Sequence, residues 1–177
     1  MSDQGAIDLF YGDESGVSLT PCIPYAWQFS DEDYSSPSQQ GGNLNCFALI
    51  SRDNRCLAKL SHVPITADWI RNELESFSLS LQRQTVIVLD NARIHSAKII
   101  KERFRVWQER GLFIFYLPPY SPQLNIAEIL WRKLKYEWLR AEDYAEKETL
   151  YYAVWQALSA VGQSLRIQFS QFKAGLT

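Results

Sequence analysis

Histidine and cysteine are scarce in this chain of 177 residues, and their scarcity limits the kinds of metal site it can build. There are two histidines, His62 and His95, and three cysteines, Cys22, Cys46 and Cys56. The odd number of cysteines and the lack of any C-x-x-C spacing argue against a disulfide framework or a zinc ribbon. A metal bound by this chain must therefore be held mainly by oxygen, which favours a hard cation such as Mg²⁺ or Mn²⁺.

Long apolar stretches and export signals are also missing. No apolar run approaches the roughly 20 residues of a membrane helix, and the N-terminal sequence has neither a basic nor an apolar signal region. These absences predict a cytoplasmic protein with no membrane partner. The hydrophobic fraction of 46% is ordinary for a globular protein, and 177 residues are enough for one domain with a sizeable core.

The small net charge of −2 conceals an uneven distribution along the chain. Residues 1–81 contain 4 Lys/Arg and 11 Asp/Glu, residues 82–140 contain 11 and 5, and residues 141–177 contain 3 and 4. The basic middle region would attract a polyanion such as DNA although the whole chain is slightly acidic. The alternative is that these basic residues form ordinary solvated helix faces.

Apolar patterning predicts an α/β fold with a mixed sheet flanked by helices. The expected strands cover residues 7–11, 17–20, 25–29, 44–51, 56–60, 85–89 and 112–117, the expected helices cover 67–81, 96–110, 124–140 and 145–162, and a polar loop covers 30–42. Thr66 is the expected N-cap of the first helix, and Gly111 is expected to end the second. The strands at 85–89 and 112–117 are expected to be buried and parallel, with a right-handed crossover. No repeat or domain boundary is evident, so residues 1–177 are expected to form a single domain.

Two aspartates follow apolar runs that are expected to be strands. Asp13 comes just after residues 7–11, and Asp90 directly follows residues 85–89. Open α/β sheets place their ligands at the carboxyl edge of the strands, and two neighbouring carboxylates repel unless a cation lies between them. Each aspartate could instead be a turn former or a helix cap. Glu14 could be a fourth ligand, but it is expected to point away from Asp13, because adjacent strand residues face opposite sides.

A third acid, Glu128, belongs to the helix expected after the proline-rich segment. Arg132 and Lys135 follow it at i+4 and i+7 and therefore share its face. The opposite face is apolar and is expected to join the core through Ile126, Leu130, Leu134 and Trp138. A carboxylate beside two cations suits a site that binds both a metal and a phosphate. The alternative is a simple Glu128–Arg132 pair on a solvated face.

The residues expected to contact DNA phosphates lie near these acids. They are Arg93, His95, Lys98, Arg132 and Lys135. His95 has a second interpretation as a polar residue near a helix start. Most aromatic residues are expected in the core, whereas Trp131 and Tyr136 are also candidates for contact with nucleic acid bases.

Three segments together resemble the catalytic blocks of DDE transposases, and in particular the insertion-sequence transposases related to mariner elements, which are DDE superfamily endonucleases. They are Asp13-Glu14-Ser15, Leu89-Asp90-Asn91-Ala92-Arg93-Ile94-His95, and Leu117-Pro-Pro-Tyr-Ser-Pro-Gln-Leu-Asn125-Ile-Ala-Glu128 with Trp131 and Lys135 downstream. The second and third segments are specific in combination, whereas the first alone is a weak signal. The resemblance covers roughly residues 7–140.

The resemblance implies a ribonuclease H-like fold and a catalytic triad of Asp13, Asp90 and Glu128 that binds two divalent ions, Mg²⁺ or Mn²⁺. It implies hydrolysis of a DNA phosphodiester at the transposon end, followed by attack of the freed 3′-hydroxyl on target DNA. Relatives favour a TA target, a step that deforms easily. The implied partners are transposon-end DNA, target DNA and, because such transposases usually work as dimers, a second copy of the chain.

Two departures from the family pattern affect these expectations. The family usually reads Leu-Asn-Pro-Ile-Glu where this chain has Leu124-Asn125-Ile126-Ala127-Glu128, and loss of the proline is expected to loosen the helix start. Full-length relatives also carry helix-turn-helix modules upstream, and no such N-terminal domain is expected in this chain. Recognition of transposon ends would then need a separate helix-turn-helix polypeptide, as for a frameshifted second reading frame, a truncated remnant or an excised domain.

Three other functions are compatible with the sequence. A non-catalytic DNA-binding or assembly module would act by pairing with a full-length transposase. A related nuclease would cut DNA without joining strands. A hydrolase that acts on sugars through a carboxylate pair would need no metal.

Overall fold

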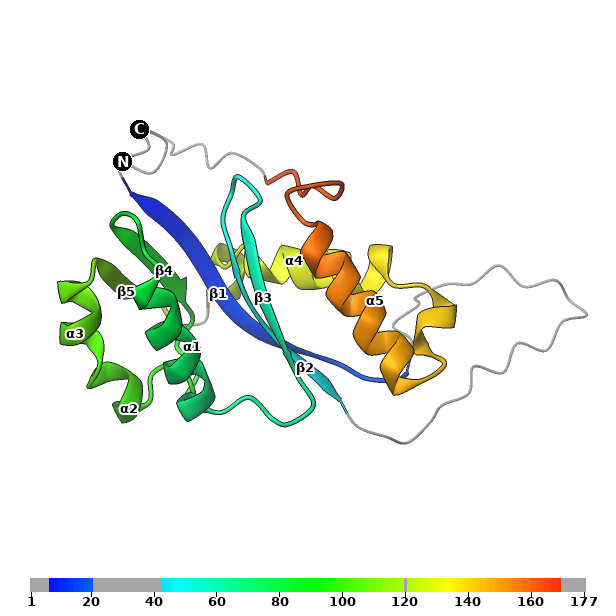
Figure 1. The fold of residues 1–177 in the computed structure, drawn as a ribbon, viewed down its shortest axis with the longest axis horizontal. Coiled ribbons are helices and arrows are strands. Elements are labelled where there is room, and N and C mark those ends of the chain that lie inside the picture. The colour runs from blue at the N-terminus through cyan, green and yellow to red at the C-terminus, as the bar shows by residue number, and fades with distance from the viewer. Residues whose placement is uncertain (1–6, 21–42, 120, 170–177) are drawn as a thin grey trace, which may run out of the picture.

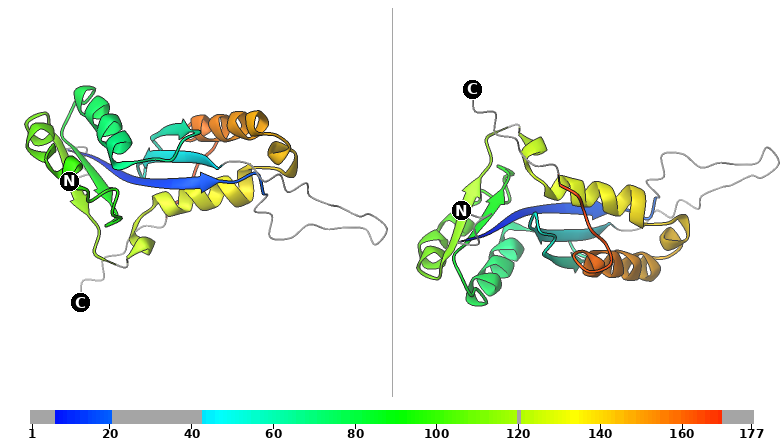
Figure 2. Two further views of the ribbon diagram at one scale, coloured as in Figure 1. Left: turned by 90° about the horizontal axis from the view of Figure 1, so that it is seen from below. Right: turned by 90° about the horizontal axis from the view of Figure 1, so that it is seen from above.

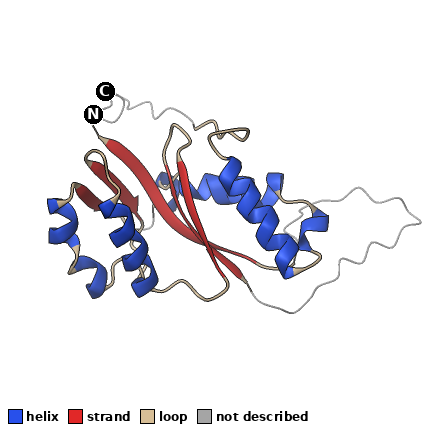
Figure 3. Ribbon diagram, in the orientation of Figure 1, coloured by secondary structure: helices blue, strands red, loops and turns tan. Residues whose placement is uncertain are grey.

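The computed structural model describes residues 7–20, 43–119 and 121–169 (Figures 1 and 3). The separate strand expected at 17–20 is wrong, because the first strand ends at Val17 and residues 18–20 are not in a strand. The strands are β1 Asp8–Val17, β2 Leu44–Ile50, β3 Cys56–Ser61, β4 Thr85–Leu89 and β5 Leu112–Tyr116. The helices are α1 Ala67–Leu79, α2 Lys98–Lys101, α3 Phe104–Glu109, α4 Ala127–Lys133 and α5 Lys147–Ala160. The strand predicted at 25–29 and the loop predicted at 30–42 lie outside the described residues. No helix in the described ranges is long and apolar enough to cross a membrane.

The strands form one mixed sheet in the order β3-β2-β1-β4-β5, which confirms the predicted fold class. β1 pairs with β2 antiparallel and with β4 parallel, and β4 pairs with β5 parallel, as expected for a strand–helix–strand unit. β1 is therefore the central strand. The expectation that the strand at 112–117 is buried is wrong in part, because β5 lies at the sheet edge and the Phe115 side chain is exposed.

β1 is longer than the sequence predicts. It does not end at Gly12 but continues to Val17, because β2 pairs with it along this whole stretch, from Tyr11↔Ile50 to Val17↔Leu44. Glycine at position 12 suits the packing, since a Cβ there would lie 2.6 Å from the Leu89 side chain. Asp13 consequently lies within a strand, and the prediction that it follows one is wrong.

The sheet separates two hydrophobic clusters. Phe47 and Leu49 of β2 pack with α1, α2 and α3, whereas the alternate residues Cys46, Ala48 and Ile50 belong to a second cluster with α4 and α5. Figure 2 shows α1 and α4 on opposite sides of β1, and α5 alongside β3. This alternation follows from the two-residue period of a strand. It also means that adjacent residues of β1 reach different sides of the sheet.

One long helix was the expectation for residues 96–110, but the structure contains two short ones, α2 and α3. The turn between them places Arg103 and Trp107 against Glu75 of α1: Arg103 Nη2 donates to Glu75 Oε2 at 2.7 Å and Trp107 Nε1 donates to the same oxygen at 2.9 Å. Arg110 Nη1 donates to Glu75 Oε1 at 2.6 Å. Tertiary contacts of this kind override local helix propensity. The Thr66 N-cap of α1 and the Gly111 stop, with φ +89°, are confirmed.

The hydrogen bonds of Glu75 with Arg103, Trp107 and Arg110 predict a pH-dependent contribution to stability. Burial opposes ionisation of Glu75, but the hydrogen bonds from Arg110, Arg103 and Trp107 outweigh it and lower its pKa to about 2. Because the pKa of Glu75 in the folded protein lies below its ordinary value of 4.5, this contribution is full above pH 4.5 and is lost as the pH falls toward 2. Glu75→Gln should therefore lower the free energy of unfolding by about 2 kcal/mol at pH 7 and by much less at pH 3. Urea unfolding of both proteins at the two pH values measures this, and an equal difference at both would contradict it.

Candidate active site

The sheet places Asp13 and Asp90 side by side. β1 and β4 are in parallel register with Tyr11 opposite Val88. Continuing that register by two residues sets Asp90 opposite Asp13. β4 ends at Leu89, so this flank of β1 is open beyond Tyr11. The predicted proximity of the two carboxylates therefore follows from the pairing of their strands.

The Asp13 side chain lies on the α4 side of the sheet and is only 9% exposed. Trp131 of α4 donates a hydrogen bond from Nε1 to Asp13 Oδ2 at 3.1 Å. Burial raises the pKa of Asp13 to about 7, and the charges of Glu14, Glu128 and Asp90 raise it further, with only His95 opposing them. The base contact considered for Trp131 is not supported, because its side chain is buried against Asp13.

Glu128 reaches the site from the first turn of α4, which is tied to β1 by Asn125. Asn125 is buried, donates from Nδ2 to the Gly12 carbonyl at 3.1 Å, and accepts a hydrogen bond from the Ala127 N–H at 3.1 Å. The helix start therefore has a polar anchor, although the family's proline is replaced by Ile126. No role was predicted for Asn125, although an Asn two residues before a helix is a signal that could have suggested one.

An open groove of about 550 Å³ runs beside Asp13 along α4. Its lining residues are Asp13, Glu14, Ser15, Glu128, Ile129, Trp131, Arg132, Lys135 and Tyr136. The expected common face of Glu128, Arg132 and Lys135 is confirmed by this lining, and no ion pair within the described ranges joins Glu128 to Arg132. Beyond Lys133 the helix continues as a π-helical turn, Leu134–Trp138, instead of the regular helix expected to residue 140. This widened turn leaves the Tyr136 side chain exposed at the groove.

The structure does not support the DNA contact expected for His95, because its imidazole is fully buried. The ring lies between two carboxylates, with Nδ1 2.6 Å from Asp90 Oδ1 and Nε2 2.7 Å from Glu14 Oε2. The second contact has the separation of an ion pair without the alignment of a hydrogen bond, so we treat it as a charge–charge contact. Burial alone would lower the pKa of His95, but Glu14 and Asp90 outweigh it and raise the pKa.

The other two expected DNA contacts are exposed but do not line the groove. Arg93 lies in the turn after Asp90, and the Lys98 side chain is 89% exposed and 3.7 Å from Glu102. Arg132 and Lys135 therefore line the groove and Arg93 and Lys98 do not, and DNA contacts from all four side chains stay predictions.

The site contains more negative charge than its own cations neutralise. Glu128 acts on the Asp13 carboxylate from one side and Asp90 from another, and Asp13 is already buried. Within the described ranges, no three acidic, imidazole or thiol side chains converge closely enough to form a ready-made metal site. A divalent cation would nevertheless remove the repulsion among these groups, and carboxylate oxygens are the ligands that Mg²⁺ and Mn²⁺ prefer. The donor set thus fits such a cation.

Comparison with known protein families identifies the family of this chain. A family model described as DDE superfamily endonuclease matches residues 8–151, which include Asp13, Asp90 and Glu128. The chain belongs to this family. Its fold is similar to those of transposase and integrase catalytic domains. No curated protein matched the sequence.

Solved transposase and integrase structures share the fold of this DDE domain. The Mos1 mariner paired-end complex with Mn matches with a TM-score of 0.62 and 14% identity over 86% of this chain and 48% of that chain. The catalytic core domain of BIV integrase matches with a TM-score of 0.55 and 16% identity over 90% and 86%. The simian T-cell lymphotropic virus intasome matches with a TM-score of 0.57 and 12% identity over 96% and 59%.

At these identities the likeness establishes the fold alone, which is the predicted ribonuclease H-like fold. The DDE domain spans about half the length of the Mos1 chains that it matches.

Proposed function

We propose that this DDE domain cleaves DNA phosphodiester bonds and transfers the freed 3′ ends to target DNA, with Asp13, Asp90 and Glu128 as its catalytic, metal-binding residues. One observation carries the proposal. The buried Asp13 lies in register with Asp90 and lines one groove with Glu128, Arg132 and Lys135. Asp13, Glu128 and two bases along one open groove, with Asp90 beside Asp13, suit metal-assisted cleavage of a phosphate diester better than reaction of a neutral substrate.

The proposed cofactor is a pair of Mg²⁺ or Mn²⁺ ions. The oxygen-rich donor set supports this choice, as do Mos1 paired-end complexes solved with Mn and with Mg. When bound, such ions lower the pKa of an attacking oxygen and stabilise the leaving oxygen. The residues that would hold them are Asp13, Asp90 and Glu128.

The protein's own groups would prepare the substrate. Trp131 fixes one oxygen of Asp13 by its hydrogen bond and thereby orients the carboxylate. Arg132 and Lys135 would bind phosphates along the groove and hold the strand beside the acids. Asn125 would keep Glu128 in line with β1, because it joins the start of α4 to the residue before Asp13.

The proposed partners are transposon-end DNA and a target, with TA as the favoured target step. Mos1 complexes with a left transposon end and after strand transfer support DNA as the substrate class. A second copy of the chain and a helix-turn-helix polypeptide belong to the same proposal.

A DNA assay with purified protein tests the function. The protein is incubated with a labelled transposon-end duplex and a supercoiled plasmid, with Mn²⁺ or with EDTA. The proposal predicts nicking of the duplex and joined products only with Mn²⁺. Nicking without joining would replace it by a nuclease, and binding without any cleavage would replace it by a non-catalytic assembly module.

A further inference from the structure

The buried imidazole of His95 lies between two acids, Glu14 within β1 and Asp90 directly after β4. Its Nδ1 lies 2.6 Å from Asp90 Oδ1, and its Nε2 lies 2.7 Å from Glu14 Oε2. Glu14 is the neighbour of Asp13 on β1, and it points to the other side of the sheet, as expected from strand alternation. The ring is fully buried, so its two nitrogens have lost contact with water and face the two carboxylates instead.

The segment that carries His95 is fastened to the sheet. Tyr116 at the end of β5 donates from its hydroxyl to the His95 carbonyl at 2.8 Å. Asn91 donates from its side-chain amide to the Leu117 carbonyl. The His95 N–H donates to the Ala92 carbonyl at 3.0 Å. The ring therefore has a fixed place relative to β4 and β5.

Both hydrogen bonds to the Asp90 carboxylate go to one oxygen. Oδ1 lies 2.6 Å from His95 Nδ1 and accepts a hydrogen bond from the Ala92 N–H at 2.9 Å. Oδ2 has no hydrogen bond within the described ranges, and the Asp90 side chain is 43% exposed. One carboxylate oxygen is thus held and the other is left for a ligand.

We propose that His95, braced by Glu14, is a positioning residue that orients the Asp90 carboxylate for metal binding. The inference rests on the proposed function. Two adjacent residues of β1 then have different roles: Asp13 supplies one metal ligand, and Glu14 aligns a second ligand, Asp90, through His95. Replacement of a residue that orients a metal ligand typically changes metal affinity by about 10–100-fold, and we expect an effect of this size here.

Two substitutions of His95 separate the two ring contacts. An asparagine amide nitrogen can replace Nδ1, whereas a glutamine amide nitrogen can replace Nε2. His95→Asn should keep the hydrogen bond to Asp90 and bind Mn²⁺ within about 3-fold of the unsubstituted chain, and His95→Gln should bind it about 10–100-fold more weakly. A purely packing role predicts the opposite order, because glutamine fills more of the space left by the ring.

Calorimetric titration of the metal-free proteins with Mn²⁺ measures these affinities, and thermal unfolding of the same samples reports their folding. Equal affinities of His95→Asn and His95→Gln, or the opposite order, would overturn the positioning role and leave the proposed function standing. A chain without substitutions that binds no Mn²⁺ would overturn both.

Nuclear magnetic resonance gives a readout that needs no metal. The chain has two histidines, so His62→Gln leaves His95 as the only source of imidazole signals. We expect a strongly shifted Nδ1–H proton that disappears in Asp90→Asn and persists in Glu128→Gln. A spectrum that Asp90→Asn leaves unchanged would refute the contact on which the positioning role depends.

Discussion

Asp13→Asn is expected to abolish DNA cleavage and, at the same time, to make the metal-free protein more stable. The loss of cleavage should be about 10³-fold, because the substitution removes one of the three proposed metal ligands. The stability gain should be about 2–4 kcal/mol at pH 8, because the variant no longer carries a buried carboxylate among Glu14, Glu128 and Asp90. The asparagine can still accept the hydrogen bond from Trp131.

The pKa of Asp13 gives the sign of this pH dependence. In the folded protein the pKa of Asp13, about 7, lies above its ordinary value of 3.8. The stability contributed by this carboxyl is therefore full below pH 3.8 and is lost as the pH rises toward 7. Asp13→Asn does not lose this stability as the pH rises. Its gain in free energy of unfolding over the unsubstituted protein should therefore be largest at pH 8 and small at pH 4.

Urea unfolding at the two pH values tests the gain. Asp68→Asn is the control, since Asp68 is exposed on α1 and pairs with Arg71 at 3.1 Å; its effect should stay below about 1 kcal/mol. If Asp13→Asn were less stable than the unsubstituted protein at pH 8, the charge crowding inferred for the site would be wrong.

The double variant Arg132→Glu/Lys135→Glu is expected to bind a DNA duplex about 100-fold more weakly at moderate salt. Both side chains line the groove, so their reversal should remove two phosphate contacts and repel the strand. The dependence of log K on log salt should flatten by about two units. Fluorescence anisotropy with a labelled duplex over a salt series measures both quantities.

A matched control keeps the net charge change but moves it away from the groove. Lys101 and Arg105 lie on α2 and α3, on the opposite side of the sheet from α4, and both are exposed (Figure 2). Reversal of these two charges should change affinity by less than about 5-fold, because only distant, screened interactions are lost. Equal losses in both double variants would mean that DNA binds by overall charge and not in the groove.

The parallel pairing of β4 with β5 could be predicted from the sequence, because strongly apolar, β-branched segments have few alternatives. The full length of β1 could not be predicted. Asp13 and Glu14 look like the start of a turn, yet their backbone pairs with Phe47 and Ala48, and such pairing depends on residues more than 30 positions away. The break between α2 and α3 has the same origin, in contacts with Glu75 of another helix.

The acidic residues of the candidate site could be predicted from the sequence more readily than the residues that hold them in place. Asp13, Asp90 and Glu128 stand in short motifs; the sheet register sets Asp90 beside Asp13, and Glu128 lines the same groove as Asp13. The contacts of His95 and Asn125 depend on the distance between β1 and other elements, which no local pattern contains. His95 was for that reason expected on the surface, whereas the structure buries it.

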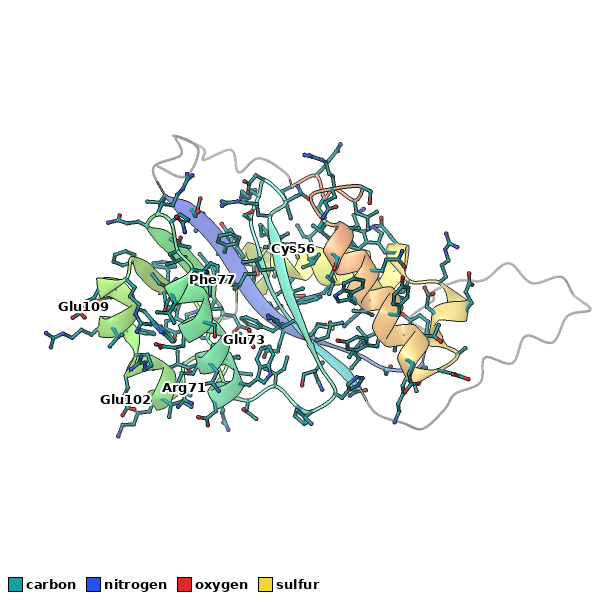
Figure 4. All side chains as sticks on the ribbon, in the orientation of Figure 1. Cys56, Arg71, Glu73, Phe77, Glu102 and Glu109 are labelled. Carbon is teal, nitrogen blue, oxygen red and sulfur yellow. The ribbon has the colours of Figure 1, made fainter. Side chains whose placement is uncertain are left out.

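The most direct test of the whole account is a Mn²⁺ titration of the metal-free protein by calorimetry. The account predicts binding that Asp13→Asn, Asp90→Asn and Glu128→Gln each weaken at least about 10-fold. Glu109→Gln is the control, because Glu109 lies on the outer side of α3, away from the sheet (Figure 4), and it should bind like the unsubstituted chain. Affinities that do not change in the three site variants would contradict the claim that these carboxylates form a metal-dependent active site.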